Sequence, residues 1–207
     1  MTGIDDAFGA LAKRRKFDCA DVLHTHKTLF EAIYPWAGQD RRQTAPHLTV
    51  RRGNVIFANP PDIRRAIEYA LQIGQDKDEM IKKPGEVMGY LAFGHPFLDG
   101  NGRTIMTIHS VMAQRAGFSI NWAATSQADY LDALTKELDD PRSGHLDNYL
   151  KPFIAEAVAY DQLATQIAGA PGIDGRGEAR ANEVLGVSSD PAVKEQYAAM
   201  LRNRDRG

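Results

Sequence analysis

The chain has 207 residues, of which 43% are hydrophobic, and its formal net charge is −2 at pH 7. These values predict one domain of ordinary size with a sizeable core, and they exclude global disorder. The net charge also excludes a general nucleic-acid-binding protein, which would carry a clear basic excess, so we expect no direct nucleic-acid binding.

The cysteine content and the N-terminus favour a reducing compartment. Cys19 is the single cysteine, so no internal disulfide can form. The first sixteen residues lack the apolar core of a signal peptide, and no apolar run is long enough to span a bilayer. We therefore expect a soluble, cytoplasmic protein without membrane contact.

Helical periodicity dominates the chain and predicts an all-α or mainly α fold. An amphipathic stripe over Cys19 to Ile33 predicts the first helix, which ends before the proline and glycine of 34–38. Asn59 followed by Pro60-Pro61 is typical of a helix start, and apolar residues then recur from Ile63 to Ile73. Further helices are predicted over 85–94, 101–116, 126–138 and 144–168.

Two segments differ from this pattern. Short β-prone runs flank Gly53-Asn54 within residues 48–57, which predicts a hairpin. Residues 169–177 contain four glycines and a proline, which predicts a linker. We therefore expect a helical domain over 1–168 and a separate tail over 178–207, with a short helix from Ala192 to Arg202 that starts at Ser189-Asp190-Pro191.

The segment His95-Pro-Phe-Leu-Asp-Gly-Asn-Gly-Arg103 lies between two apolar runs and is predicted to be a loop between buried helices. Asn101 can cap the second helix, whose N-terminus favours a phosphate. Gly100 and Gly102 allow the backbone to approach an anion, and Arg103 adds forked donors for phosphate oxygens.

The same segment holds a base and a metal ligand. Asp99 lies beside the anion site, where a lone carboxylate is a typical ligand of magnesium. His95 has an unperturbed pKa that suits a general base at neutral pH. Each residue alone could be ordinary turn or surface structure. All of them within nine residues favour phosphoryl or nucleotidyl transfer to a hydroxyl.

This segment resembles the signature of the Fic (filamentation induced by cAMP) domain family. Phe30, the stretch Ile33-Tyr-Pro-Trp-Ala-Gly38 and Arg41 resemble the region upstream of that signature, and the likeness covers about residues 17–160. The resemblance implies a Fic-type helical bundle with a small β-hairpin flap at about 48–57. That flap would align a target segment by strand pairing.

The resemblance also implies an activity and roles for the loop residues. Most studied Fic proteins transfer AMP from ATP to a Ser, Thr or Tyr hydroxyl of a target protein. By resemblance, His95 deprotonates that hydroxyl, Asp99 holds Mg²⁺ and Arg103 contacts the phosphates. Phe97 would pin the loop to the core. Gly100, Asn101 and Gly102 would form the anion hole.

One departure from the signature concerns the donor. The family has a second arginine three residues after the first, which orients the γ-phosphate, and here that position is Met106. Its loss removes a charge-assisted contact of about 1.5–3 kcal/mol. The protein could therefore transfer AMP slowly, use another nucleotide or phosphate-linked donor, or be a catalytically impaired nucleotide-binding or interaction module.

A second departure concerns inhibition by a small antitoxin or an intramolecular helix carrying Ser/Thr-x-x-x-Glu-Gly/Asn. No clear copy of that motif is present; Ser143 to Asn148 comes nearest, but has Asp in place of Glu. The tail from Arg180 to Pro191 faintly resembles small Fic antitoxins, with Leu185 in the glutamate position, although an ordinary charged tail is the alternative. The resemblance is consistent with a toxin inhibited by a partner protein, or with an effector delivered into a host cell.

Overall fold

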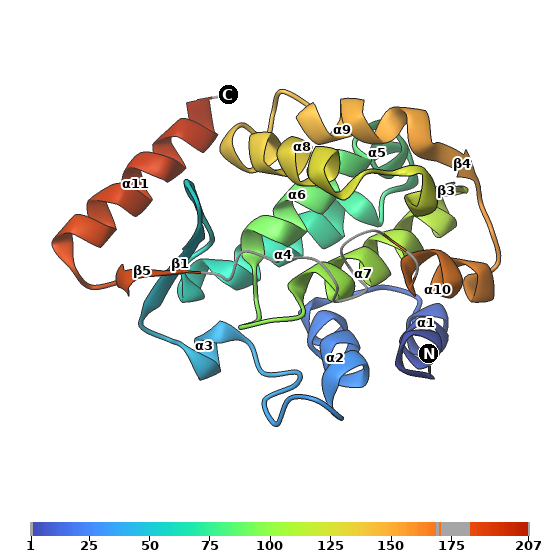
Figure 1. The fold of residues 1–207 in the computed structure, drawn as a ribbon, viewed down its shortest axis with the longest axis horizontal. Helices are drawn as coiled ribbons and strands as arrows, with labels where there is room; N and C mark the ends of the chain where they lie inside the picture. Colours follow the sequence, from blue (N-terminus) through green and yellow to red (C-terminus); the bar gives the residue numbers. More distant parts are fainter. Residues whose placement is uncertain (1, 169, 171–182, 207) are drawn as a thin grey trace.

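The computed structural model describes residues 2–168, 170 and 183–206, and helices dominate it (Figure 1). The mainly α fold predicted from the periodicity is confirmed. None of the helices in these ranges is long and apolar enough to cross a membrane. The helices are α1 (Thr2–Ala12), α2 (Cys19–Phe30), α3 (Arg41–Thr44), α4 (Pro60–Gly74), α5 (Lys77–Lys82), α6 (Pro84–Gly94), α7 (Asn101–Ala116), α8 (Gln127–Asp139), α9 (His145–Leu150), α10 (Tyr160–Ala168) and α11 (Pro191–Arg206).

Helices α6 and α7 lie at the centre of the molecule, and the other helices pack around them (Figure 1). Both are buried on most faces: α6 is mostly apolar, whereas α7 also buries polar residues such as Thr107, His109 and Ser110. Gly85 allows α6 to approach α9 closely, because a Cβ there would lie 2.2 Å from the backbone nitrogen of Asp147. Because α6 ends at Gly94 and α7 begins at Asn101, these two central helices hold both ends of the loop 95–100.

The predicted hairpin is present as β1 (Leu48–Arg52) and β2 (Val55–Ile56), which pair antiparallel. The turn between them contains Gly53 with φ 58°, a left-handed conformation that favours glycine. Two short strands that the sequence reading missed, β3 (Phe118–Ile120) and β4 (Ile154–Glu156), form a separate antiparallel pair.

The prediction of one helix over 144–168 was wrong. Helix α9 ends at Leu150, a 3₁₀ turn covers Lys151–Phe153, and the chain then enters β4 before α10 begins. Pro152 has no backbone N–H to donate and is tolerated only in the first turn of a helix, so α9 cannot continue through it, although Lys151 before it keeps helical angles. The apolar residues beyond it kept a helix-like spacing, but the backbone of Ile154–Glu156 pairs with β3 instead.

The part of the predicted tail that the structure describes, residues 183–206, packs on the hairpin and on the helical body. Strand β5 (Glu183–Val187) pairs with β1, giving the sheet order β2-β1-β5 (Figure 1). Helix α11 begins at Pro191 as predicted, with the Asp190 carboxylate accepting from the Ala192 amide, and continues to Arg206. The glycine-rich stretch 169–177, apart from Ala170, lies outside the described residues.

Candidate active site

The segment His95–Arg103 joins the C-terminus of α6 to the N-terminus of α7, as its flanking apolar runs predicted. His95 ends α6 with φ 40°, a left-handed conformation that is uncommon for a residue with a side chain. Gly100 has φ 79°, and a Cβ there would lie 2.6 Å from the Phe30 ring. Glycine is therefore required at 100 by both backbone conformation and packing.

Asn101 does not cap α7, contrary to prediction. It is the first residue of the helix, and Gly100 occupies the cap position without a side-chain hydrogen bond. The Asn101 side chain turns back into the loop: its Oδ1 accepts from the Phe97 amide at 2.9 Å, and its Nδ2 donates to the Phe97 carbonyl at 2.8 Å. These bonds fix the amide orientation and tie the loop across four residues.

The His95 imidazole is buried, with 3% of the residue exposed. Asn101 Nδ2 lies 3.2 Å from His95 Nε2, and because that amide nitrogen is a donor, Nε2 carries the lone pair of the neutral ring. Burial holds the pKa of His95 well below its ordinary value, and the guanidinium groups of Arg41 and Arg52 lower it further. His95 is therefore a neutral imidazole with Nε2 as its basic atom.

The Asp99 carboxylate lies at the exposed edge of the loop and is held by two donors. The Gly100 amide donates to Oδ1 at 2.7 Å, and the Tyr34 hydroxyl donates to Oδ2 at 2.5 Å. Donation to this carboxylate raises the pKa of Tyr34. Among the described residues no group of three or more metal-ligating side chains occurs, so Asp99 could hold a cation only together with a ligand or water.

The first turn of α7 has open space in front of it. A Cβ on Gly102 would meet no atom within 4 Å, so nothing within the described residues demands glycine there. The first amides of a helix have no intrahelical acceptor and favour an anion. Arg103 stacks over Phe30 at 5.0 Å from the ring centroid and adds a positive charge beside this turn. The predicted anion-binding residues thus meet at one helix N-terminus.

Two buried side chains from distant segments hold the loop, and the sequence reading missed both roles. His26 Nδ1 accepts from the Gly38 amide, so its Nε2–H donates to the Asp99 carbonyl at 3.0 Å. Its ring also stacks on Phe97 with centroids 3.7 Å apart, which places Phe97 in the core as expected. The apolar stripe that contains His26 was the available signal, since a histidine on a buried face needs hydrogen-bond partners.

Arg41 is the second of these side chains, and 1% of it is exposed. Its Nε donates to the His95 carbonyl at 2.8 Å, and one Nη donates to the Ala58 carbonyl at 2.6 Å. Burial lowers its pKa to about 10. Arg41 therefore connects the loop to the segment that follows the hairpin.

Met106 is also buried, with 4% exposed, on the core side of α7. The described residues therefore supply no charge at the position where the signature has its second arginine. Leu185, which the antitoxin resemblance aligned with the glutamate of the inhibitory motif, belongs to strand β5 beside the hairpin. The structure gives no support to a pairing of these two apolar residues.

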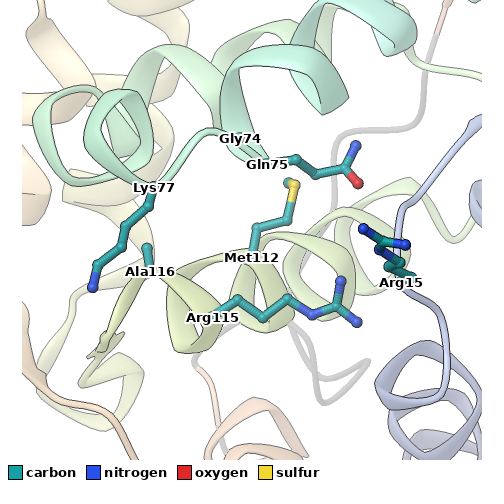
Figure 2. Close-up of a pocket in the computed structure, with 7 residues that line it drawn as sticks. All are labelled: Arg15, Gly74, Gln75, Lys77, Met112, Arg115 and Ala116. Carbon is teal, nitrogen blue, oxygen red and sulfur yellow. The ribbon is translucent and has the colours of Figure 1, made fainter.

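A hollow of about 120 Å³ lies elsewhere, between the C-terminal ends of α4 and α7 (Figure 2). Arg15, Lys77 and Arg115 line it, but the Arg115 guanidinium already donates to the Leu11 and Arg14 carbonyls. Helix C-termini carry partial negative charge and disfavour an anion. The hollow lies at the end of α7 opposite the loop, roughly 20 Å along the helix, so it is not part of the candidate site.

Known proteins are similar to the part of the chain that contains this site. A family model described as Fic/DOC matches residues 16–113, which include the whole loop and the hairpin. Protein adenylyltransferase VbhT of Bartonella schoenbuchensis is 34% identical over 118 residues, which cover 52% of this chain and 23% of that protein. A probable protein adenylyltransferase, y4lH of Sinorhizobium fredii, is 25% identical over 128 residues, covering 58% of this chain and 64% of that protein. This chain thus spans less than two thirds of either relative.

Solved structures show the same fold at low identity. The N-terminal Fic domain of a putative cell filamentation protein from Bartonella quintana, with bound ADP, aligns with a TM-score of 0.63 and 20% identity over 78% of this chain and 85% of that one. BepC from Bartonella tribocorum, with bound AMPPNP, aligns with a TM-score of 0.59 and 19% identity over 75% of this chain and 84% of that one. Residues 16–113 therefore match the Fic/DOC family model, and the solved Fic domains share the fold of this chain.

Proposed function

We propose that this protein transfers AMP from ATP to a Ser, Thr or Tyr hydroxyl of a target protein. The observation that carries the proposal is the meeting, at the N-terminus of α7, of a neutral histidine base, an exposed carboxylate and an anion-binding turn. The two relatives named above are adenylyltransferases, one of them a probable one, which supports the same reaction.

The residues divide the reaction between them. His95 Nε2 takes the proton of the target hydroxyl, because it is the basic atom of a neutral ring. The hydroxyl oxygen then forms a bond to the α-phosphorus, the bond from that phosphorus to the bridging oxygen breaks, and pyrophosphate leaves. The amides of the first turn, at Asn101 and Gly102, and the Arg103 guanidinium hold phosphate oxygens as negative charge shifts toward the leaving group.

Asp99 is the residue that would hold Mg²⁺, and its exposed carboxylate fits such a role. Bound there, Mg²⁺ would supply positive charge to phosphate oxygens of the donor. A single protein carboxylate suffices, because Mg²⁺ keeps several waters and takes its other ligands from phosphate. Tyr34 and the Gly100 amide orient the carboxylate in advance.

Incubation with α-labelled ATP, magnesium and cell lysate tests the proposal. We expect label on a lysate protein with the native chain, loss of label with His95→Ala, and no loss with His24→Ala. His24 is exposed on α2 and is a matched control. Nucleotide binding without transfer by the native protein would contradict the proposed enzyme and favour an impaired Fic module.

Buried Met106 favours a second candidate, in which the donor is another nucleotide or a phosphate-linked metabolite. A donor without a γ-phosphate would not need the missing arginine. Parallel assays with ATP, GTP, UTP, CTP and CDP-choline separate the two candidates. Faster transfer from GTP, UTP, CTP or CDP-choline than from ATP would show that the transferred group is not AMP.

Control by a small antitoxin, and a role as a toxin or as an effector delivered into a host cell, extend this proposal. Growth arrest of bacteria on expression, relieved by a co-expressed partner, would support a toxin. Toxicity or target labelling confined to host cells would support an effector.

A further inference from the structure

The hairpin closes over the proposed base. Phe57 directly follows β2, and its ring stacks on the His95 ring with centroids 3.9 Å apart and planes 15° from parallel. With Asn101 at Nε2, this contact leaves His95 almost without exposed surface. A target hydroxyl can reach His95 only after the flap, defined as residues 48–57, has moved.

The C-terminal segment Glu183–Arg206 occupies the outer edge of the flap. Leu48 and Thr49 oppose Val187 and Gly186, and after a bulge the pairing continues to Arg51 and Glu183. The Ser188 amide adds a hydrogen bond of 2.7 Å to the His47 carbonyl. Edge strands are where an extended peptide of another chain would pair, so β5 takes the place that such a peptide needs.

A second contact joins this segment to the base of the flap. The Asn59 amide donates to the Tyr197 hydroxyl at 3.1 Å, and that hydroxyl donates to Asp62 at 2.9 Å. Asn59 Oδ1 in turn accepts from the Thr49 hydroxyl at 2.7 Å. Tyr197 is thus linked, through one residue, to β1 and to the backbone two residues beyond Phe57.

The far end of α11 anchors the segment on the helical body. The Arg204 guanidinium donates to the Leu138 carbonyl at the end of α8 and stacks over Phe93, 4.0 Å from the ring centroid. The Phe93 carbonyl accepts from the Ala58 amide, next to Phe57. The segment therefore bridges from the flap edge to the helix that carries His95 at its end.

We propose that residues 183–206 form an intramolecular clamp, which holds the flap closed over His95 and competes with an extended segment of the target for the edge of β1. Opening requires β5 to leave β1, after which Phe57 can move off His95. The inference rests on the proposed function for the identity of the competitor, but the closure of the flap is independent of the transferred group.

Two full-length variants weaken the clamp at different points. Tyr197→Phe removes only the hydroxyl that bonds Asn59 and Asp62. Gly186→Val places a Cβ 2.8 Å from a Val193 methyl and so separates β5 from α11. Gln196→Ala is the matched control, because Gln196 is exposed on α11.

Three measurements report on the clamp. Hydrogen exchange follows the amides of peptide 48–57, mass spectrometry follows modification of His95 by diethyl pyrocarbonate, and the labelled-ATP assay follows transfer. We expect both clamp variants to speed exchange in the flap and modification of His95 by about three- to tenfold, the range that one lost hydrogen bond produces. Modification of buried His109 stays unchanged and shows that the fold persists.

Transfer activity separates the clamp from the proposed reaction. Faster transfer by both variants supports clamp and reaction together. Faster modification of His95 with no transfer from any nucleotide supports the clamp and contradicts the proposed function. Unchanged flap exchange and unchanged His95 modification in both variants would overturn the clamp. Slower transfer by the variants than by a native protein that is active would also overturn it, because targets would then pair with the exposed edge of β5.

Discussion

The His26 imidazole and the backbone of Asp99 are joined by a hydrogen bond of 3.0 Å, although 73 positions separate them in the sequence. The other ring nitrogen of His26 accepts from the Gly38 amide, so one buried ring links α2, the turn after it and the loop. Burial lowers the pKa of His26, which keeps the ring neutral and preserves this donor–acceptor arrangement. His26 thus helps to position Asp99, whose carboxylate is proposed to hold the metal, through the Asp99 backbone carbonyl.

Replacement of His26 by leucine keeps the bulk of the side chain and removes both hydrogen bonds. Two partly buried backbone groups then lose their partners, which lowers the free energy of unfolding by about 2–4 kcal/mol. Thermal unfolding should show a melting temperature lower by roughly 5–15 °C, and transfer should fall more than about tenfold. His24→Leu on the exposed face of α2 is the control, and equal effects of the two variants would contradict this role of His26.

Tyr34→Phe tests how Asp99 is oriented. The variant removes the hydroxyl that donates to Oδ2 at 2.5 Å and leaves the ring stacked on Trp36. Loss of such an outer contact typically weakens metal affinity 10–100-fold. Titration of transfer activity with Mg²⁺ should therefore show a higher half-saturating concentration, with the rate at saturating Mg²⁺ largely retained. An unchanged titration curve would mean that Tyr34 does not position the ligand.

Stability should fall with acidification, and His109 is one cause. Burial lowers the pKa of His109 from 6.5 to about 4, so between these values the unfolded chain binds a proton that the folded chain does not. Stability from this group is present above the unfolded pKa and is lost as pH falls, by about 2 kcal/mol between about pH 7 and about pH 5.

Urea unfolding of the native chain and His109→Gln at both pH values measures this contribution. We expect the variant to lose less stability on acidification. Burial raises the pKa of Glu137 to about 7, which acts in the opposite direction, but both proteins retain this group, so it cancels in the difference. An identical pH dependence for the two proteins would contradict the buried neutral state of His109.

Met106→Arg tests whether the signature can be restored. The position is buried on α7, so an arginine there is placed without a partner among apolar neighbours. We expect the free energy of unfolding to fall by at least about 2 kcal/mol, against less than about 1.5 kcal/mol for Met106→Leu. Chemical denaturation gives both values. Higher transfer from ATP by a stable arginine variant would instead show that this side chain can reach the phosphates.

The helices and the loop between them could be predicted because their signals are local. Apolar spacing gave α2, α4, α6, α7 and α8, and Gly53-Asn54 gave the hairpin. The same reasoning failed at Pro152, because the apolar spacing was followed although proline interrupts a helix. It also failed at Asn101, whose side chain bonds the backbone of Phe97 in the loop and does not cap α7.

The sequence by itself determined the chemistry of the site, because a base, a carboxylate and an anion-binding turn stand within one short segment that any fold must keep together. Only the tertiary structure decided what surrounds them. The Asp99 carbonyl accepts a hydrogen bond from His26, and Arg41 joins the His95 carbonyl to the chain beyond the flap. Strand β5 pairs with the flap, where Glu183 bonds Arg51 from 132 positions away in the sequence. Such contacts depend on how helices pack and which strand edges stay open. The spacing of residues along the chain does not encode helix packing or open strand edges, and the burial of His95 depends on both.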